Sequence, residues 1–401
     1  MNRNNQREDR DKIRSTEKSN EEKNTPKREN PYPRAKKETE QPVVIGITQG
    51  DINSISYEVI LKTFADSRMY DFCTPLLYGS TKIASYHKKL LSLPEYSYFG
   101  VRDAQMVNVA KFNVLNIIAD EVKIDIGVST PIAGELSAKA LEMACQDLQN
   151  GSIDALVTGP INKENIQSDS FRFAGHTEFL TKRFGVKDSL MIMCCDHIHI
   201  GIVTNHLALK DVTNHLTQEL LLRKLNVFHQ SLRRDFGIES PKIAVLALNP
   251  HAGDGGVNGK EDQEIIYPAI KQAQDQGILS FGPYPADGFF GSGEQIHFDG
   301  VLALYHDQGL IPFKLMSFDE GVNYTAGLPY VRTSPAHGTA YDIAGKGVAS
   351  PQSFRNAVYL AADIVRNRRN YDIMHANPLK KARQQNVPDE DLPQEEENDT
   401  Y

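Results

Sequence analysis

Short apolar runs alternate with amphipathic stretches along most of this 401-residue chain. The runs are too short for buried helices, and the stretches between them carry apolar residues at helical spacing. Such alternation predicts β-α-β units, in which parallel or mixed strands form a sheet with helices on both faces. The expected strands are residues 43–48, 75–78, 113–117, 155–157, 190–194, 198–203, 243–248 and 301–304.

The expected helices begin and end at ordinary signals. Pro131 opens an amphipathic pattern that closes at Asn150-Gly151, as in a helix with proline in its first turn and glycine beyond its end. No Gly-x-Gly-x-x-Gly motif follows a strand, so a dinucleotide would not be bound in the Rossmann manner. The other helices are expected at residues 57–64, after Ser80, and at 219–236, 263–276 and 351–368.

Both ends of the chain have a composition typical of disorder. Residues 1–41 hold twelve Lys/Arg and nine Asp/Glu with almost no aliphatic side chains, too few to offset the entropy of ordering. Residues 377–401 form an acidic tail, in which 388–401 carry seven acidic and no basic residues. We therefore expect the folded body to span residues 42–376.

Charge and hydropathy argue against several classes of protein. The net charge is −8, and no basic stripe interleaved with aromatic residues indicates nucleic-acid binding. No run approaches the roughly eighteen apolar residues of a membrane span, and the start lacks the apolar region of a secretory signal. The four cysteines have neither zinc spacing nor a disulfide framework. We expect a cytoplasmic protein without membrane or nucleic-acid partners.

Three histidines, His206, His251 and His306, each follow an apolar run closely. In open α/β sheets, ligands bind at the carboxyl ends of the strands. A single histidine there is more often a hydrogen-bonded structural residue, but three in the same setting predict a divalent metal with an open position for substrate. Asp287, in Tyr-Pro-Ala-Asp-Gly, is either an acid at this metal site or a turn residue.

A second group of residues suits an anionic substrate. His176 and Thr177 open a helical pattern, and free N–H groups at a helix start favour phosphate or carboxylate. A capping segment with Thr177 as the N-cap is the simpler interpretation, and both can hold together. Lys314, Asn323 and Arg332 add cations and an amide within apolar or Gly/Pro-rich sequence, where an unpaired charge is costly.

The segment 334–347 is rich in glycine and other small residues, which let the backbone approach a flat ligand closely. His337 and Asp342 within it are candidates for contact with the adenine or ribose of a nucleotide cofactor. Local turn formation is the alternative interpretation of this segment taken alone.

Five longer motifs follow one another along the body. They are Thr-Gly-Pro-Ile-Asn-Lys (158–163), Gly-His-Thr-Glu (175–178), Leu-Asn-Pro-His-Ala-Gly-Asp-Gly-Gly (248–256), Tyr-His-Asp-Gln-Gly-Leu-Ile-Pro-Phe-Lys (305–314) and the segment 334–347. Together they resemble the 4-hydroxythreonine-4-phosphate dehydrogenase family, the NAD-dependent, metal-requiring enzymes of pyridoxal 5′-phosphate biosynthesis. The resemblance runs from about residue 43 to residue 368. The last segment also looks like the adenosine-binding loop of isocitrate and isopropylmalate dehydrogenases.

This resemblance implies an isocitrate/isopropylmalate dehydrogenase-like α/β fold with two domains and a cleft between them. Residues 42–155 plus 335–376 would form the first domain, on the cofactor side. Residues 156–334 would form the second, with the metal, the substrate and the interface of a homodimer that shares its active site.

The resemblance also implies roles for individual residues. The implied metal ligands are His206, His251 and His306, for zinc, cobalt or magnesium. The implied substrate-binding residues are His176, Thr177, Lys314, Asn323 and Arg332, with NAD or NADP as cofactor.

The implied reaction is oxidation and decarboxylation of 4-phosphooxy-L-threonine to 3-amino-2-oxopropyl phosphate, with His176 or Lys314 as candidate bases. A paralogue that oxidises threonate or erythronate 4-phosphate remains an alternative. An acyl-phosphate transferase and a non-enzymatic binding protein are more distant ones.

The chain departs from the family pattern in one loop. The family usually has a Gly-Asp-Pro-Ala-Gly-Ile-Gly-Pro-Glu-like run, whereas residues 50–58 read Gly-Asp-Ile-Asn-Ser-Ile-Ser-Tyr-Glu. Ser54 and Ser56 replace two glycines, and both prolines are gone. If those glycines need positive φ or close ligand approach, the loop shape or a phosphate contact would change.

Overall fold

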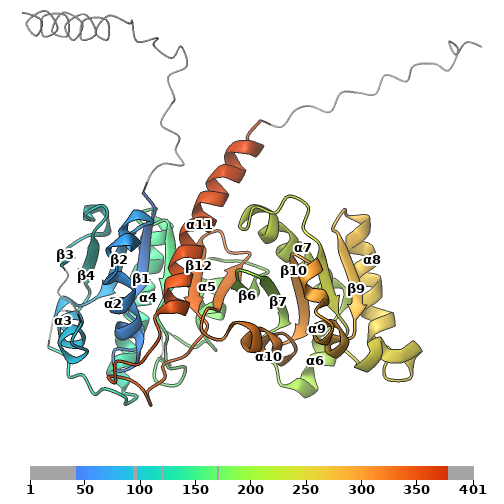
Figure 1. Cartoon of the computed structure of the whole chain (residues 1–401), viewed down its shortest axis with the longest axis horizontal. Coiled ribbons are helices and arrows are strands. Elements are labelled where there is room, and N and C mark those ends of the chain that lie inside the picture. Colours follow the sequence, from blue (N-terminus) through green and yellow to red (C-terminus); the bar gives the residue numbers. More distant parts are fainter. Residues whose placement is uncertain (1–41, 94–96, 119–120, 169–170, 378–401) are drawn as a thin grey trace, which may run out of the picture. The chain divides into compact units, whose positions relative to one another are not determined.

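The computed structural model describes residues 42–93, 97–118, 121–168 and 171–377. The two terminal segments expected to be disordered lie outside these ranges, apart from residue 377. In the described part, twelve strands form one sheet in the order β3-β4-β2-β1-β5-β12-β11-β6-β7-β10-β8-β9 (Figure 1). The strands are β1 (Val44–Thr48), β2 (Thr74–Gly79), β3 (Tyr98–Val101), β4 (Phe112–Asn116), β5 (Ala155–Thr158), β6 (Leu190–Cys195), β7 (Ile198–Thr204), β8 (Ile243–Leu246), β9 (Ser280–Tyr284), β10 (Gly300–Tyr305), β11 (Val322–Ala326) and β12 (Val331–Pro335).

Helices follow most of the strands, as the alternating pattern predicted. They are α2 (Ser56–Phe64), α3 (Thr81–Leu90), α4 (Pro131–Gln149), α5 (His176–Arg183), α6 (Leu209–His215), α7 (Gln218–Arg234), α8 (Tyr267–Asp275), α9 (Ala286–Gly291), α10 (His306–Ser317) and α11 (Gln352–His375). A short π-helical segment, Asp262–Ile266, precedes α8. Among the described residues, no helix combines the length and apolar character that crossing a bilayer requires.

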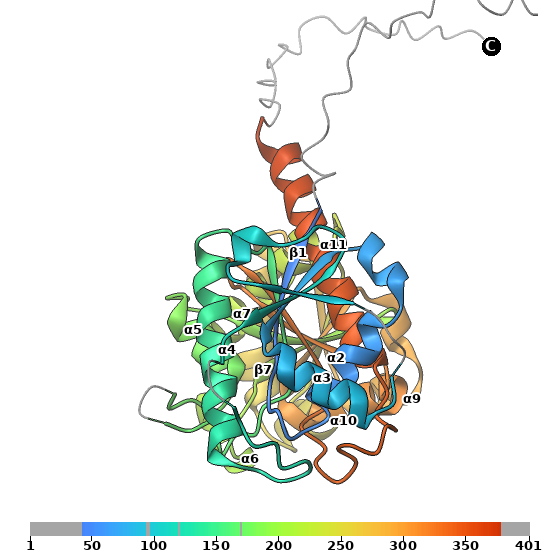
Figure 2. The ribbon, with the colours of Figure 1, turned by 90° about the vertical axis from the view of Figure 1, so that its left-hand side faces the viewer.

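Alternate side chains of the strands pack on opposite faces of the sheet. In β10, Leu302 and Leu304 join a core with α2, α7, α8 and α11, whereas Val301 and Ala303 face α9 and α10. A third core packs α4 and α5 against the opposite side of β1, β2 and β5. Figure 2 shows α4 and α2 on either side of β1. The predicted α/β class, a mixed sheet with helices on both faces, is confirmed.

The sheet has two parallel blocks joined by an antiparallel centre. The pairs β12–β11, β11–β6 and β6–β7 are antiparallel, and all other described pairs are parallel. The sheet runs without a break across the predicted domain boundary, where Ala155 of β5 pairs with Val331 of β12. The division into two domains at this boundary stays a prediction.

All eight strands expected from the sequence are present, and four more were missed. Strands β11 and β12 carry Asn323 and Arg332 in place of a clean apolar pattern, and β9 contains Pro283. Helix α10 was missed because it contains Gly309 and Pro312. A Cβ at position 309 would lie 2.4 Å from the Cδ1 atom of Ile202, so glycine allows this helix to pack closely on β7.

The altered loop at residues 50–58 is closed by its own side chains. Neither Ser54 nor Ser56 has a positive φ. The Ser54 hydroxyl donates to the Asp51 carbonyl at 2.7 Å, and the Ser56 hydroxyl donates to the Gln49 carbonyl at 2.5 Å. The serines thus occupy ordinary backbone conformations and satisfy their own polar atoms, so the positive φ that would exclude them is not required here.

Candidate active site

A cavity of about 290 Å³ gathers most of the residues singled out in the sequence. It lies where the loop after β5, the start of α5, the end of β12 and the first turns of α10 meet. Its lining comprises Thr158–Ile161, Lys163, Gly175–Glu178, Met191, Met193, His206, His306, Leu310, Lys314, Asn323, Arg332 and Ser334–Gly338. No residue of the altered loop at 50–58 lines it.

Two of the three predicted metal ligands lie together at this cavity. The ring centroids of His206 and His306 are 6.2 Å apart. Nδ1 of His206 is 2.8 Å from Oε1 of Glu178, and Nδ1 of His306 is 2.6 Å from Oδ1 of Asp307. A carboxylate at Nδ1 fixes the tautomer and raises the basicity of the opposite nitrogen, so Nε2 of each ring is the atom suited to a metal.

The third predicted ligand, His251, lies elsewhere in the single chain. It sits in an exposed loop after β8 and does not line the cavity. Within the part of the chain that the structure describes, no three His, Cys, Asp or Glu side chains are placed to hold one metal ion. Asp287 is exposed in the first turn of α9 and is also absent from the lining. One chain therefore assembles two of the three imidazoles.

All five predicted substrate-binding residues line the cavity: His176, Thr177, Lys314, Asn323 and Arg332. Helix α5 starts at His176, as expected for a site at a helix N-terminus. Its N-cap is Gly175, so the interpretation of Thr177 as the N-cap is wrong. The backbone turns into the helix two residues earlier, which places both side chains in the first turn.

Arg332 is a buried cation with neutral partners. Its side chain is 2 % exposed, and its two terminal nitrogens donate to the hydroxyls of Thr325 and Thr158 at 3.1 and 2.7 Å. Burial lowers the pKa of Arg332 to about 10, which leaves the guanidinium charged at neutral pH. Its buried Nε atom has no hydrogen-bond partner in the protein. The charge of Glu178 offsets part of the cost of burial, but neither of these side-chain hydrogen bonds of Arg332 goes to a carboxylate, so the guanidinium is suited to an anionic ligand.

His176 is held neutral beside this cation. Burial, followed by the charges of Arg332 and Lys163, lowers its pKa well below the ordinary value of a histidine. Its buried Nε2 atom is unpartnered, as is Oδ1 of Asn323. The cavity thus offers unused donors and acceptors rather than a closed hydrogen-bond network.

Sequence reasoning missed two lining residues, Glu178 and Lys163. Glu178 accepts the hydrogen bond from His206, which lowers the carboxyl pKa, and its buried Oε2 atom has no partner. It was interpreted only as a residue of the first helical turn. Lys163 ends the motif Thr-Gly-Pro-Ile-Asn-Lys, and its place after a strand and a Gly-Pro turn was the available signal.

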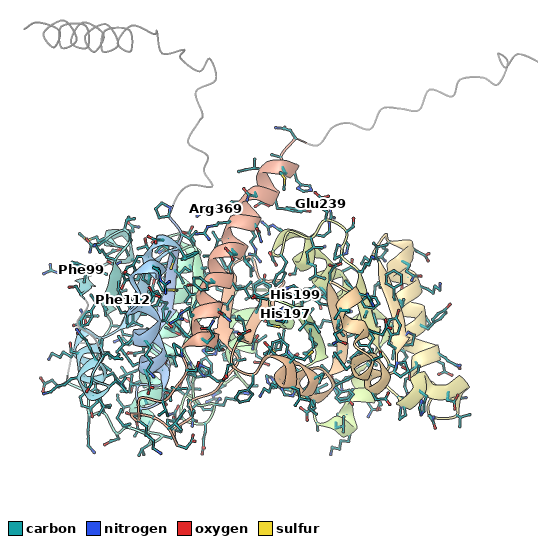
Figure 3. All side chains as sticks on the ribbon, in the orientation of Figure 1. Phe99, Phe112, His197, His199, Glu239 and Arg369 are labelled. Carbon is teal, nitrogen blue, oxygen red and sulfur yellow. The ribbon has the colours of Figure 1, made fainter. Side chains whose placement is uncertain are left out.

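The two candidate cofactor residues are placed differently. His337 lines the cavity, and its buried Nε2 atom is unpartnered. Burial lowers its pKa, so the ring is neutral near pH 7. Asp342 is exposed and lies outside the lining. His197, just before β7, and His199, near the start of β7, also lie outside the lining (Figure 3). The His199 Nδ1–H donates to the Asp299 carbonyl at 3.0 Å.

The fold and the arrangement of this site place the chain among α/β dehydrogenases. The 4-hydroxythreonine-4-phosphate dehydrogenase of Klebsiella pneumoniae superposes with a TM-score of 0.72 at 31% identity, over 81% of this chain and 99% of that one. The corresponding enzyme of Burkholderia phymatum gives 0.68 at 34% identity, over 81% and 98%. At these levels the likeness extends over the whole body.

The sequence comparisons identify the family. The model of the pyridoxal phosphate biosynthetic protein PdxA matches residues 71–361. The 4-hydroxythreonine-4-phosphate dehydrogenase of Bacteroides thetaiotaomicron is 52% identical over 343 residues, which are 85% of this chain and 94% of that protein. A protein of Oceanobacillus iheyensis, provisionally named D-threonate 4-phosphate dehydrogenase, is 34% identical over 80% of this chain and 97% of its own length. The chain belongs to the PdxA family of dehydrogenases.

Proposed function

We propose that this chain oxidises 4-phosphooxy-L-threonine with NAD and a divalent metal ion, with loss of carbon dioxide, to give 3-amino-2-oxopropyl phosphate for pyridoxal 5′-phosphate synthesis. The observation that carries the proposal is one cavity lined both by a buried arginine that hydrogen-bonds to neutral threonines and by two carboxylate-paired histidines. Identity of 52% to a relative with this named activity supports the same substrate.

The cationic side of the cavity binds the charged ends of the substrate. Arg332 supplies a guanidinium whose Nε is free, and the start of α5 supplies backbone N–H groups. Lys314 adds a second cation from α10. Arginine binds phosphate and carboxylate through paired hydrogen bonds, so these groups orient the substrate as well as hold it.

The paired histidines fit a divalent metal. Nε2 of His206 and Nε2 of His306 would hold it, with Glu178 and Asp307 fixing the two rings. When bound, such an ion lowers the pKa of a substrate hydroxyl and polarises the ketone that follows. Of the expected ions, zinc and cobalt suit imidazole donors better than magnesium, which prefers oxygen ligands.

Proton transfer from the substrate hydroxyl needs an acceptor within the cavity. His176 and Lys314 were the two candidates. The lowered pKa of His176 makes it a weak proton acceptor, because its protonated form is disfavoured by burial and by Arg332. This argues against His176 as the base and leaves it as a neutral hydrogen-bonding group. Lys314 stays the other candidate, and it could accept the proton only as the neutral amine, not in the cationic form that would bind an anionic group. His337 and the segment after it would contact the nicotinamide cofactor.

The metal site is completed when two copies of the chain pair, and the third imidazole, His251, comes from the partner copy. A second hollow, of about 280 Å³, adjoins the cavity at His206 and His306 and is lined in part by Leu207, Leu209 and Val212. Exposed apolar side chains extend along α10 and just beyond its end, including Ile311, Leu315 and Phe318. A homodimer would cover this surface and place His251 at the partner's cavity. The cytoplasmic location stays a prediction from the sequence.

The direct test is an assay of purified protein with NAD and cobalt or zinc. We expect NADH formation with 4-phosphooxy-L-threonine, its loss on chelation, and its return on adding metal. Equal or faster turnover of D-threonate or D-erythronate 4-phosphate would instead assign the chain to the sugar-acid branch that the Oceanobacillus relative represents. Turnover that survives complete chelation would contradict the metal role.

A further inference from the structure

The loop that carries His251 has an unusual backbone. The five residues 251–255 have φ between 46° and 79°, in the left-handed region, and Gly256 follows at 95°. Three of the five, His251, Ala252 and Asp254, are not glycine. Each non-glycine residue in this region costs roughly 1–2 kcal/mol, so such a run persists only where surrounding contacts fix it.

A buried carboxylate binds the start of this loop, Leu248 and Asn249. Asp262, which is 1% exposed, begins the π-helical segment before α8. Its Oδ1 accepts from the Leu248 N–H at 2.8 Å, and its Oδ2 accepts from the N–H and the side-chain Nδ2 of Asn249 at 3.1 and 2.9 Å. Glu261 also accepts from Asn249 Nδ2, at 2.8 Å. Three donors, from the two residues Leu248 and Asn249 shortly before His251, therefore converge on one carboxylate.

The rest of the loop folds back onto its start at Asn249. The Ala252 N–H donates to the Asn249 carbonyl at 3.2 Å, and the Asn258 N–H donates to the Gly253 carbonyl at 3.0 Å. A Cβ at Gly259 would lie 2.6 Å from Nδ2 of Asn249. The Asn249 side chain is thus held between the two acidic residues Glu261 and Asp262 and the backbone at Gly259. Its position sets the direction in which the chain enters the left-handed turn.

We propose that Asp262 is a positioning residue for the metal site: through Leu248 and Asn249 it fixes the left-handed turn that presents the His251 imidazole to the partner subunit's metal. This inference rests on the proposed function, because it takes His251 as a metal ligand. Asp262 itself touches neither metal nor substrate. A carboxylate suits the position because an amide has one acceptor oxygen and turns its NH₂ group toward donors.

The test measures metal affinity rather than turnover. Cobalt(II) is titrated into the metal-free dimer against a competing chelator, and its visible absorption reports the ligand geometry. We expect Asp262→Asn to weaken cobalt binding about 10- to 100-fold, the usual effect of losing a residue that orients a ligand. Glu264→Gln is the matched control: it removes the same charge from the same segment, but Glu264 is exposed, so cobalt affinity should be unchanged.

Two further variants make each outcome decisive. Asn249→Ala keeps the two backbone bonds to Asp262 and should cause a smaller loss of affinity in the same direction, which covers the case that Asp262→Asn does not fold. His251→Ala is the reference for the ligand. If His251→Ala weakens cobalt binding while both Asp262→Asn and Asn249→Ala bind it normally, the positioning role is wrong and the proposed function stands. If His251→Ala itself binds cobalt normally, the metal role in the proposed function fails.

Discussion

Arg332 is the residue on which substrate binding should depend most. It is buried, its hydrogen bonds go to neutral threonines, and its Nε is free for a ligand. A hydrogen bond to a charged group contributes about 1.5–3 kcal/mol, so Arg332→Ala should lower kcat/KM at least about 10- to 100-fold. Steady-state kinetics with NAD saturating would measure this, and most of the effect should appear in KM.

Arg332→Lys separates charge from shape. Lysine keeps the charge but lacks the planar fork, so we expect a KM between those of the wild type and Arg332→Ala. Arg68→Ala, at an exposed position that pairs with Asp66 and lies outside the cavity lining, is the control and should leave KM unchanged. An Arg332→Ala enzyme with wild-type KM would contradict the assignment of this residue to the substrate.

His87 should make stability depend on pH. It is 1% exposed, its Nε2 contacts the Ile52 carbonyl at 2.9 Å, and its ring stacks on Tyr57. Burial lowers the pKa of His87 to about 4, whereas an unfolded chain would have the ordinary value near 6.5. The unfolded state therefore takes up the proton first, and stability should fall as pH decreases from about 6.5 to 4, by on the order of 3 kcal/mol.

Chemical denaturation across this pH range would measure the effect. His87→Phe keeps the stacking but cannot be protonated, so its stability should fall less over the same range. His215→Phe alters an exposed histidine at the end of α6 and should follow the wild-type profile. If the wild type and His87→Phe show the same slope, the buried ring does not titrate as described.

For single residues, the sequence predicted which ones belong to the site better than it predicted which side chains they contact. His206 and His306 could be chosen because each follows an apolar run, His176 because it opens a helical pattern, and Arg332 because it lies within apolar or Gly/Pro-rich sequence. The pairing of Glu178 with His206 could not be foreseen. Glu178 lies in helix α5 and His206 follows strand β7, and the sequence does not indicate that these two elements lie side by side. Contacts between distant elements depend on the twist of the sheet, which periodicity does not encode.

Helix α10 is the element on which pairing of two copies should depend. Leu315 is 84% exposed and Phe318, just beyond the helix, is 75% exposed. Leu315→Glu would bury a carboxylate in the proposed interface, so it should shift the protein from dimer to monomer in sedimentation velocity. Circular dichroism should remain native, because the side chain makes no core contact.

Leu90→Glu, on α3, provides the comparison. Leu90 is also an exposed leucine near a helix end, at 42% exposure, but it lies far along the sheet from α10. It should leave the dimer intact. A Leu315→Glu variant that sediments like the wild type would place the interface on another surface.

Elements with clean periodicity were predictable, and three elements that carry polar residues of the site were not. The strands β1, β7 and β10 are rich in apolar residues and were located within about two residues. Strands β11 and β12 and helix α10 were missed, and each carries a polar residue that faces the cavity: Asn323, Arg332 and Lys314. A residue placed for a ligand breaks the pattern by which its element would be recognised.

In the proposed dimer, each metal site takes ligands from both chains, so two inactive variants should complement each other. His206→Ala and His251→Ala should each be inactive alone. Co-expressed, they should form mixed dimers with one intact site, and random pairing gives about a quarter of the wild-type activity. Assay of the purified mixture would measure this recovery.

Co-expression of His206→Ala with His306→Ala is the control, since both rings belong to one chain's cavity. No activity should return. If the first mixture also stays inactive while its dimers are shown to be mixed, all three histidines act within one chain and the shared site is wrong.

The whole molecule was the least predictable from sequence. The α/β class followed from alternation alone, but the joining of two parallel blocks through three antiparallel pairs did not, because β11 and β12 were not recognised. A site shared between two chains was expected from the family resemblance alone, and the pattern of one chain does not indicate that His251 lies apart from the other two histidines.

The separation of His251 from the pair at the cavity has a consequence for the cell. A newly made chain would be inactive until it paired with a second copy. At low expression, total enzyme activity would then rise more steeply than the concentration of chains. Activity would become proportional to that concentration only when nearly every chain is in a dimer. Vitamin synthesis through such an enzyme would carry a built-in threshold in gene dosage.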